Sequence, residues 1–262
     1  MKTSITKKTS FLRNGGIYTI ISFLLLLAAW KLISLVISSE IILPSPENTA
    51  ISMLDLIRTR EFFIIILSSL QRGVLGFILS FVLGIFFGFL SGLSRIFRSI
   101  FEPFLSVIRT TPVITIILIA LIWFKANNVP VFASFLMAFP IICTNVIEGI
   151  DSIDQKILEM AKIFRIKKSR VIGEIYIPSL IPFLTAAVST SFGIGWKVVI
   201  AAEVLSQPKY AIGTSLQTSK IYLNINDVFA WTIYAILIGY VIERIIRLAE
   251  SKTVKWKKKN ES

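Results

Sequence analysis

Long hydrophobic runs, separated by short polar stretches, dominate the pattern of this chain. A helix needs roughly 20 apolar residues to cross a hydrocarbon layer of ~30 Å, and six runs approach or exceed that length. No remaining segment is long enough for a separate soluble domain. The pattern therefore predicts an all-α, polytopic membrane protein with about six transmembrane helices. The six runs cover residues 17–37, 69–93, 103–124, 129–150, 177–205 and 228–248.

Prolines lie within or between several of these runs. Pro112, in "RTTPV", should kink or break the third run because proline lacks the backbone donor that a helix needs. Pro140 falls in the middle of the fourth run. Between the first two runs, "LPSPENT" (43–49) carries two prolines that we expect to exclude helix at that point, before an amphipathic stretch to about residue 65.

Small residues recur at four-residue spacing in the second run. Ser80, Gly84, Gly88 and Gly92 would share one helical face, and small side chains let two helices approach closely in lipid. The stripe predicts a helix-packing surface. Packing inside the same bundle is favoured, and an interface between subunits is the alternative.

Composition supports a membrane protein and excludes several chemistries. The chain is 55% hydrophobic with a net charge of +13, and it contains no histidine and one cysteine, Cys143. Histidine-based metal sites and Ser-His or Cys-His nucleophile pairs are therefore excluded, and we expect no metal. The positive charge alone would also suit nucleic acid. Its gathering in alternate polar segments instead follows the positive-inside rule of membrane proteins, so we expect no nucleic-acid partner.

The same rule predicts the orientation of the chain. With the N-terminus in the cytoplasm, residues 1–16 form a cytoplasmic tail, residues 17–250 the transmembrane domain, and residues 251–262 a basic cytoplasmic tail. The first run is long and no A-x-A site closes it, so we interpret it as a retained anchor rather than a cleaved signal peptide. The segments predicted inside hold Lys2, Lys7, Lys8, Arg13, Arg95, Arg98, Lys156, Lys162, Arg165, Lys167, Lys168, Arg170 and the lysines of the C-terminal tail.

The loop at 151–176 includes most of "EMAKIFRIKKSRVIGEIYIP" (159–178), which is too polar to enter a bilayer. Asp154 is a good N-cap, since its carboxylate can accept free amide protons of a first helical turn. Ile157, Met160, Ala161 and Phe164 follow at helical spacing and share one face. A short amphipathic helix of this kind either lies on lipid headgroups or enters a groove on a partner, and the pattern alone leaves both open.

Three ionisable residues fall within or near the hydrophobic runs: Arg109, Lys197 and Glu203. A charge in mid-bilayer costs about 2.5–3.5 kcal/mol on insertion scales, so each should face protein or a water-filled path. They are candidates either for the lining of a translocation path or for internal ion pairs.

The loop resembles that of ATP-binding-cassette (ABC) importer permeases, whose pattern is E-A-A, three residues, G, nine residues, I-x-L-P. The spacing is kept throughout, with mild changes at Met160 and Ile177. Arg165 stands at the glycine position that normally marks a bend, which bears on how sharp that bend is. The matching residues are Glu159, Met160, Ala161, Arg165, Ile175, Tyr176, Ile177 and Pro178.

Other stretches resemble one subgroup, the nitrate/sulfonate/taurine-type permeases, which also includes carriers of thiamine-pyrimidine precursors. The resemblance covers roughly residues 43–250. Its substrate class is accordingly a small anion of the sulfonate, nitrate or taurine kind, or a pyrimidine-type nutrient. The stretches are "LPSP" (43–46), "SLQRGVLGF" (69–77), "GLSRIFRSIFEP" (92–103), "WKVVIAAEVL" (196–205) and "ERIIRLAE" (243–250).

The resemblance implies a subunit of the bacterial cytoplasmic membrane that is not itself an enzyme. Two copies would assemble with two ABC ATPase subunits, and an extracytoplasmic binding protein would deliver the solute. The chain has no G-x-x-x-x-G-K-[ST] loop, so the partner would hydrolyse the ATP and this subunit would bind no cofactor. The residues expected to couple to the ATPase are Ile157, Glu159, Met160, Ala161, Phe164, Arg165, Ile175 and Pro178.

Two other classes compete with this interpretation. A membrane enzyme would need H-E-x-x-H, a nucleophile elbow or clustered carboxylates within the spans, and the sequence has none of these. A secondary transporter or channel with a membrane-surface helix is the stronger alternative. Coupled carriers usually show paired repeat halves, which this sequence lacks.

Overall fold

The computed structural model describes residues 15–259, and the side chains of residues 17–248. That part of the chain is helical, with no strand, as the sequence predicts. The predicted N-terminal tail lies almost wholly outside the described residues, as do the side chains of the predicted basic tail. The elements are α2 (Gly15–Ile37), α3 (Pro46–Arg58), α4 (Phe62–Leu93), α5 (Arg95–Thr110), α6 (Val113–Trp123), α7 (Val129–Asp151), α8 (Gln155–Ile163), α9 (Lys168–Val171), the π-turn η1 (Ile172–Tyr176), α10 (Ile177–Ser206), α11 (Ile212–Ile221) and α12 (Ile225–Lys259).

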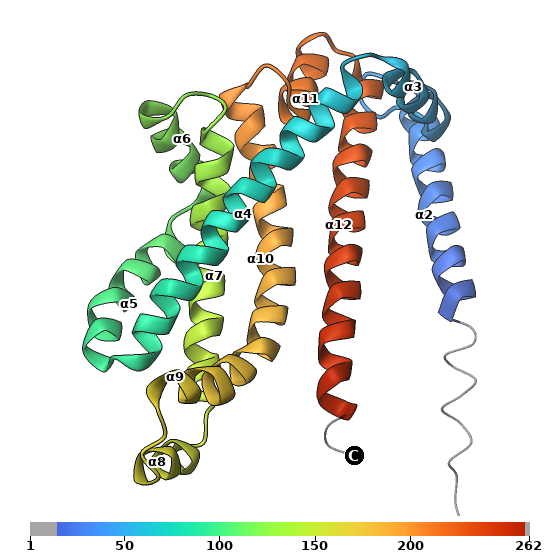
Figure 1. Ribbon diagram of the computed structural model, residues 1–262. Coiled ribbons are helices and arrows are strands. Elements are labelled where there is room, and N and C mark those ends of the chain that lie inside the picture. Colours follow the sequence, from blue (N-terminus) through green and yellow to red (C-terminus); the bar gives the residue numbers. More distant parts are fainter. Residues whose placement is uncertain (1–14, 260–262) are drawn as a thin grey trace, which may run out of the picture.

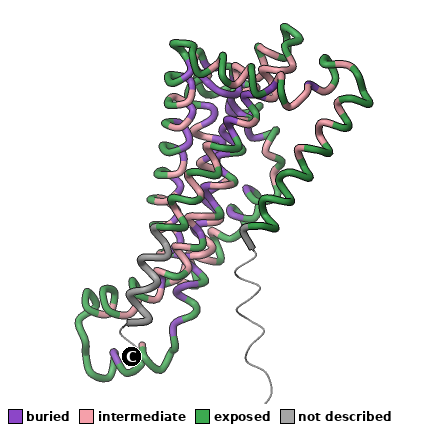
Figure 2. The backbone as a smooth tube through the Cα atoms, turned by 90° about the vertical axis from the view of Figure 1, so that its right-hand side faces the viewer, coloured by how far each residue is buried: buried purple, intermediate pink, exposed green. Residues whose placement is uncertain are grey.

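Helices α4, α7, α10 and α12 form an elongated bundle (Figure 1). Helix α7 packs along both α4 and α10, while α12 contacts α3, α10 and α11. Buried residues are concentrated where α4, α7 and α10 meet, and exposed residues predominate in α2 and the segment around α8 (Figure 2). The α8 segment and α11 lie at opposite ends of the bundle, called here the α8 end and the α11 end (Figure 1).

Five helices are long and apolar enough to cross a membrane, and a bent pair, α5 with α6, can supply a sixth crossing. The two helices of the pair meet at an angle of 100°. Helix α5 ends at Thr110, and Pro112 caps the start of α6, so the break falls where the sequence predicted it. The prediction of a span over 103–124 is wrong at its start, because Ser94 caps α5 with its side chain and the helix begins at Arg95.

The expectation that "LPSPENT" excludes helix is also wrong. Helix α3 begins inside this stretch at Pro46, after Ser45, whose Oγ accepts a hydrogen bond from the Asn48 amide at 3.2 Å. Proline is tolerated in the first helical turn because the amide proton that it lacks would have no partner there. Helix α4 likewise begins at Phe62, seven residues before the predicted run.

Helix α2 stands largely apart from the bundle, and none of its hydrophobic window is buried. It is held near its second half. The Trp30 ring stacks on Phe229 at 5.8 Å and its indole N–H donates to the Pro44 carbonyl at 3.0 Å. Lys31 pairs with Glu47 at 2.8 Å, and this hydrogen bond lowers the pKa of the Glu47 carboxyl.

The stripe of small residues on α4 faces α7. Ser80 Oγ donates to the Phe135 carbonyl at 3.0 Å. A Cβ added at Gly84 would lie 2.9 Å from the Cβ of Ile142, and one at Gly88 would lie 2.8 Å from the carbonyl oxygen of Cys143. A Cβ added at Gly92 would likewise lie 3.0 Å from the Cβ of Ile150. The stripe therefore lies within the bundle of this chain and lets α4 and α7 approach closely.

This contact generates a stability prediction. Gly88→Ala should lower the free energy of unfolding by about 1–3 kcal/mol, because the added methyl would press on backbone atoms of α7 that cannot move aside. Thermal unfolding of the detergent-purified protein measures the effect.

Gly195→Ala is the matched control, since a Cβ there would meet its nearest neighbour, Ser134, at an ordinary 3.9 Å. It should be neutral or slightly stabilising because alanine favours helix over glycine. Equal destabilisation by both substitutions would argue against the close α4–α7 contact.

Candidate functional site

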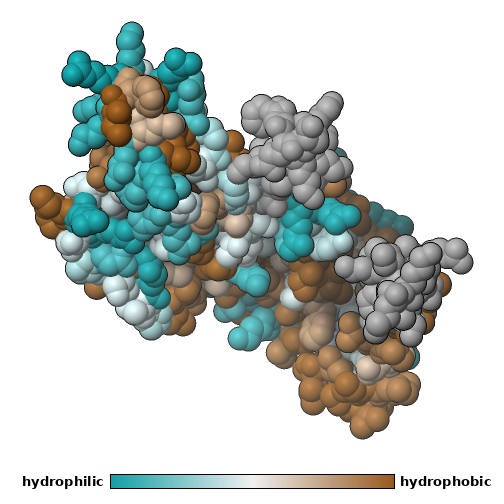
Figure 3. Space-filling model, turned by 90° about the horizontal axis from the view of Figure 1, so that it is seen from below, coloured by the Kyte–Doolittle hydropathy of each residue, from teal (hydrophilic) through white to brown (hydrophobic). Residues whose placement is uncertain are grey.

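The α8 helix presents an apolar face to solvent at its end of the bundle. Asp154 caps it, with Oδ1 accepting from the Lys156 amide at 2.9 Å. Ala161 is turned inward and buried, whereas Met160 is 49% and Phe164 73% exposed. Ile157 is exposed too. Seen from this end, hydrophobic side chains stand among the hydrophilic surface gathered at the upper left of the view (Figure 3).

A tight bend follows α8, and Arg165 forms it. Its φ of 49° lies in the left-handed region, which non-glycine residues rarely adopt. The Ile166 amide donates to the Ala161 carbonyl at 2.9 Å, and the Arg165 amide donates to that of Lys162 at 3.1 Å. This pair of bonds is a Schellman motif, whose left-handed position normally holds glycine. The sharp bend is thus present despite the arginine.

The chain then enters α10 through α9 and η1. The Ile177 amide reaches back five residues to the Ile172 carbonyl, and Pro178 follows as the second residue of α10. Ile175 is half-buried here. Glu159, in contrast, is exposed and makes no hydrogen bond or ion pair with any residue that the structure describes. The residues expected from the sequence to couple to an ATPase thus lie in one segment, in which Ala161 is buried, Ile175 is half-buried and the others are exposed.

Glu203 lies in a buried polar network near the α11 end. Its carboxylate is wholly buried and pairs with Arg72 of α4, with Arg72 Nη1 2.7 Å from Oε1. Oε2 accepts from Ser69 Oγ at 2.9 Å and from the Gly213 amide at 3.1 Å. The second guanidinium nitrogen of Arg72 donates to Asn127 Oδ1 and to the carbonyl of Tyr210. The network joins α4, α10, the start of α11 and the two loops that precede α7 and α11.

The structure thus places Glu203 in an internal ion pair. Sequence reasoning missed its partners, because Arg72 sits at the edge of a hydrophobic run and resembles a boundary residue. Ser69 and Arg72 are three residues apart and so share a helical face. That spacing, together with the single acidic residue of the fifth run, Glu203, is the signal that could have identified Ser69 and Arg72 as its partners.

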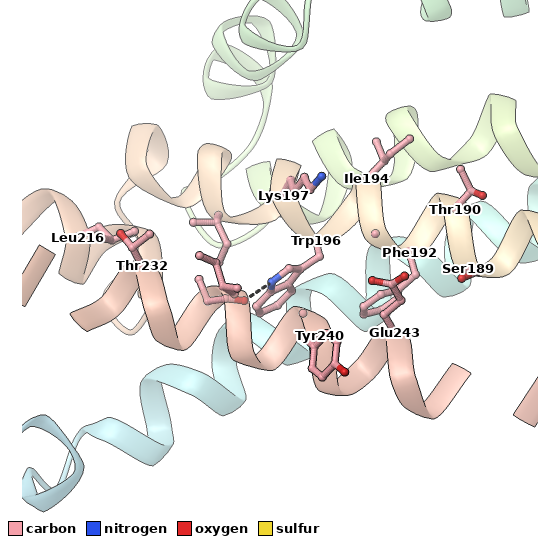
Figure 4. Close-up of a pocket in the computed structure, with 15 residues that line it drawn as sticks. Ser189, Thr190, Phe192, Ile194, Trp196, Lys197, Leu216, Thr232, Tyr240 and Glu243 are labelled. Carbon is pink, nitrogen blue, oxygen red and sulfur yellow. Dashed lines mark hydrogen bonds between the residues drawn. The ribbon is translucent and has the colours of Figure 1, made fainter. Parts of the chain in front are cut away.

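Arg109 and Lys197 each line a cavity. The larger, of about 650 Å³, lies between α10 and α12 and includes Lys197 (Figure 4). The smaller, of about 380 Å³, includes Arg109, whose Nη2 donates to Thr144 Oγ1 at 2.8 Å and lies 3.6 Å from Glu102. Ile194 lines both cavities, so the two adjoin along α10.

One face of α10 is exposed beside these cavities. We call it the α10 stripe, and it consists of Thr190, Ile194, Lys197 and Ala201. In Figure 4, Lys197 and Ile194 lie on the edge of α10 away from α12, whereas Trp196 points toward α12 and donates to the Ala235 carbonyl at 2.9 Å.

Comparison with known proteins identifies the class. Residues 80–255 match the model of the binding-protein-dependent transport system inner membrane component family, and the chain belongs to that family. It is 27% identical to SsuC of Bacillus subtilis, named as an aliphatic sulfonates transport permease, over 97% of this chain and 92% of SsuC. It is 26% identical to the nitrate import permease NrtB of Synechococcus elongatus, covering 93% of each chain.

Solved structures agree on the fold. A chain of the MetNI methionine ABC transporter, in an inward-facing conformation, superposes with a TM-score of 0.61 at 12% identity, over 75% of this chain and 98% of that one. The chain is therefore the permease subunit of an ABC importer, as the resemblance in the 151–176 loop predicted. Relatives that carry sulfonate, nitrate or, for CmpB of Synechococcus elongatus, bicarbonate leave the solute open.

The buried network yields a second prediction. Glu203→Leu or Arg72→Met alone should destabilise the protein by about 3–5 kcal/mol, because each leaves a buried charge without its partner. The double variant should recover much of that loss, since it removes both charges. Thermal unfolding of the four proteins gives the coupling between the two sites.

Glu47→Ala, which breaks the exposed pair with Lys31, is the control and should change stability little. Losses that simply add in the double variant would show that the two side chains act independently.

The bend yields a third prediction. Arg165→Gly should stabilise the α8 bend by about 1 kcal/mol, because glycine adopts positive φ without steric cost. Hydrogen exchange at the Ile166 amide should slow about fivefold, as that amide closes the motif. Lys162 lies inside α8, where glycine weakens the helix, so Lys162→Gly should instead speed exchange at the Ile166 amide. Faster exchange in Arg165→Gly would contradict the bend described here.

Proposed function

We propose that this subunit carries a small solute across the bacterial cytoplasmic membrane, receiving it from an extracytoplasmic binding protein and drawing energy from a separate ATPase through the α8 segment. The observation that carries the proposal is the exposed apolar face of α8, held on a capped and sharply bent loop. Named relatives in sulfonate and nitrate import support the solute class.

The α8 segment has the features of a docking element. Met160 and Phe164 are large apolar side chains left exposed, and such groups mark a binding surface when polar residues surround them. Glu159 beside them carries a charge with no partner among the described residues. An ATPase cleft would bury the apolar face and pair the acid at its rim. Movement of the ATPase would then pass to α10 through the short α9–η1 connection.

The α10 stripe is the proposed lining of the translocation path. Lipid would not solvate Lys197, so this face must contact protein or water. Arg109 borders the adjoining cavity. Two copies of the subunit, placed with their stripes facing, would enclose a path that a single copy leaves open. We therefore propose a homodimer with two ATPase subunits, with the α8 end in the cytoplasm.

The proposal is tested at α8. Phe164→Ser should weaken association with the cognate ATPase at least tenfold while membrane insertion stays normal, because the side chain is exposed and supports no packing inside this subunit. Glu159→Lys should do the same by placing a like charge beside Lys162. Co-purification with the ATPase and solute uptake measure both effects.

Ile221→Ser removes a comparably exposed apolar side chain at the α11 end and serves as the control. It should leave ATPase association unchanged. Unaltered uptake and association in both α8 variants would instead favour a helix that rests on the lipid surface.

A further inference from the structure

Lys197 differs from Arg72 and Arg109, each of which lies beside a carboxylate. Arg72 is paired with Glu203 at 2.7 Å, and Arg109 lies 3.6 Å from Glu102. Lys197 is exposed on α10 and makes no hydrogen bond or ion pair with any residue that the structure describes. An unpaired cation within a membrane-spanning helix is costly, so we expect Lys197 to have a compensating contact outside this copy of the chain.

The surroundings of Lys197 do not supply that contact. Of the residues that line its cavity, Glu243 is the acidic one, and it already forms an ion pair with Arg247, one turn further along α12. The remaining lining is apolar or carries hydroxyls, among them Thr190 and Thr232. The cavity therefore holds one uncompensated positive charge.

The position of the charge suits a moving solute rather than a fixed partner. Ile194, one helical turn from Lys197, lines both cavities, so the charge lies beside the junction between them. Arg109, which lies beside Glu102, borders the second cavity. Lysine carries its ammonium on a flexible stem and binds as a point charge, which favours transient contact with a small ion.

We propose that Lys197 selects a small anion as the transported solute, attracting it into the path by its unpaired positive charge. This inference rests on the proposed function, because it takes the α10 stripe as the path lining. It chooses the anionic class over the neutral, pyrimidine-type nutrient that the sequence also allowed.

Charged thiol reagents test the field of Lys197 without knowledge of the solute. A reporter cysteine is placed by Ile194→Cys, with Thr190→Cys as a second position. In permeabilised cells carrying the assembled transporter, its reaction rates with anionic sulfonatoethyl methanethiosulfonate and cationic trimethylammonioethyl methanethiosulfonate are compared. The parent chain is the background control, since its one cysteine, Cys143, is fully buried.

With Lys197 present, the ratio of anionic to cationic rates should exceed that in Lys197→Gln about tenfold, the effect of a unit charge roughly one helical turn away in a water-filled cleft. Lys197→Arg should keep the high ratio. Co-purification of the ATPase checks that each variant assembles.

The outcomes separate the inference from the proposed function. Reaction with both reagents at a ratio that Lys197→Gln leaves unchanged would overturn the role of Lys197 while leaving the path in place. If neither reagent reacts at either reporter position, the α10 stripe does not line a water-filled path. That result would overturn the path and this inference together.

Discussion

The buried ion pair between Arg72 and Glu203 holds the α11 end of the bundle together. Either charge, left buried without the other, would destabilise the protein, and each is further satisfied by hydroxyl, amide or carbonyl groups from neighbouring segments. One interaction thereby fixes α4 against α10 and anchors the loops before α7 and α11. Between the two ends, the small residues of α4 bring it against α7 at backbone distance, so α4, α7 and α10 form the packed part of the subunit.

The α8 end is built on the opposite principle. The loop from Asp154 to Pro178 is ordered mainly by capping and backbone hydrogen bonds, and it leaves Ile157, Met160 and Phe164 exposed. The subunit is therefore held by buried contacts at its α11 end and exposes an apolar surface at its α8 end. The α10 helix joins the two, since it carries Glu203 near one terminus and follows the α8 segment at the other. Any movement imposed on α8 therefore has a direct route to the α10 stripe.

Much of this was accessible from the sequence. Hydrophobic length predicted the spans, Pro112 predicted the broken one, and the spacing from Glu159 to Pro178 predicted the family. The start of α3 at Pro46 was missed because a proline suits the first turn of a helix as well as it breaks an interior. The partner of Glu203 was missed for a different reason: Arg72 lies far away in sequence, and the pairing depends on how α4 and α10 cross. The bend at Arg165 kept its geometry because backbone hydrogen bonds determine it, whereas glycine only lowers its cost.

We propose that this chain works as a pair of permease subunits that two ATPase subunits bind through α8. Native mass spectrometry of the transporter, purified through a tag on this chain and released from detergent in the gas phase, tests it directly. We expect a complex of two copies of this chain and two of the ATPase, which loses the ATPase first when the ions are activated by collision. A stable single copy that carries solute without any ATPase would contradict it.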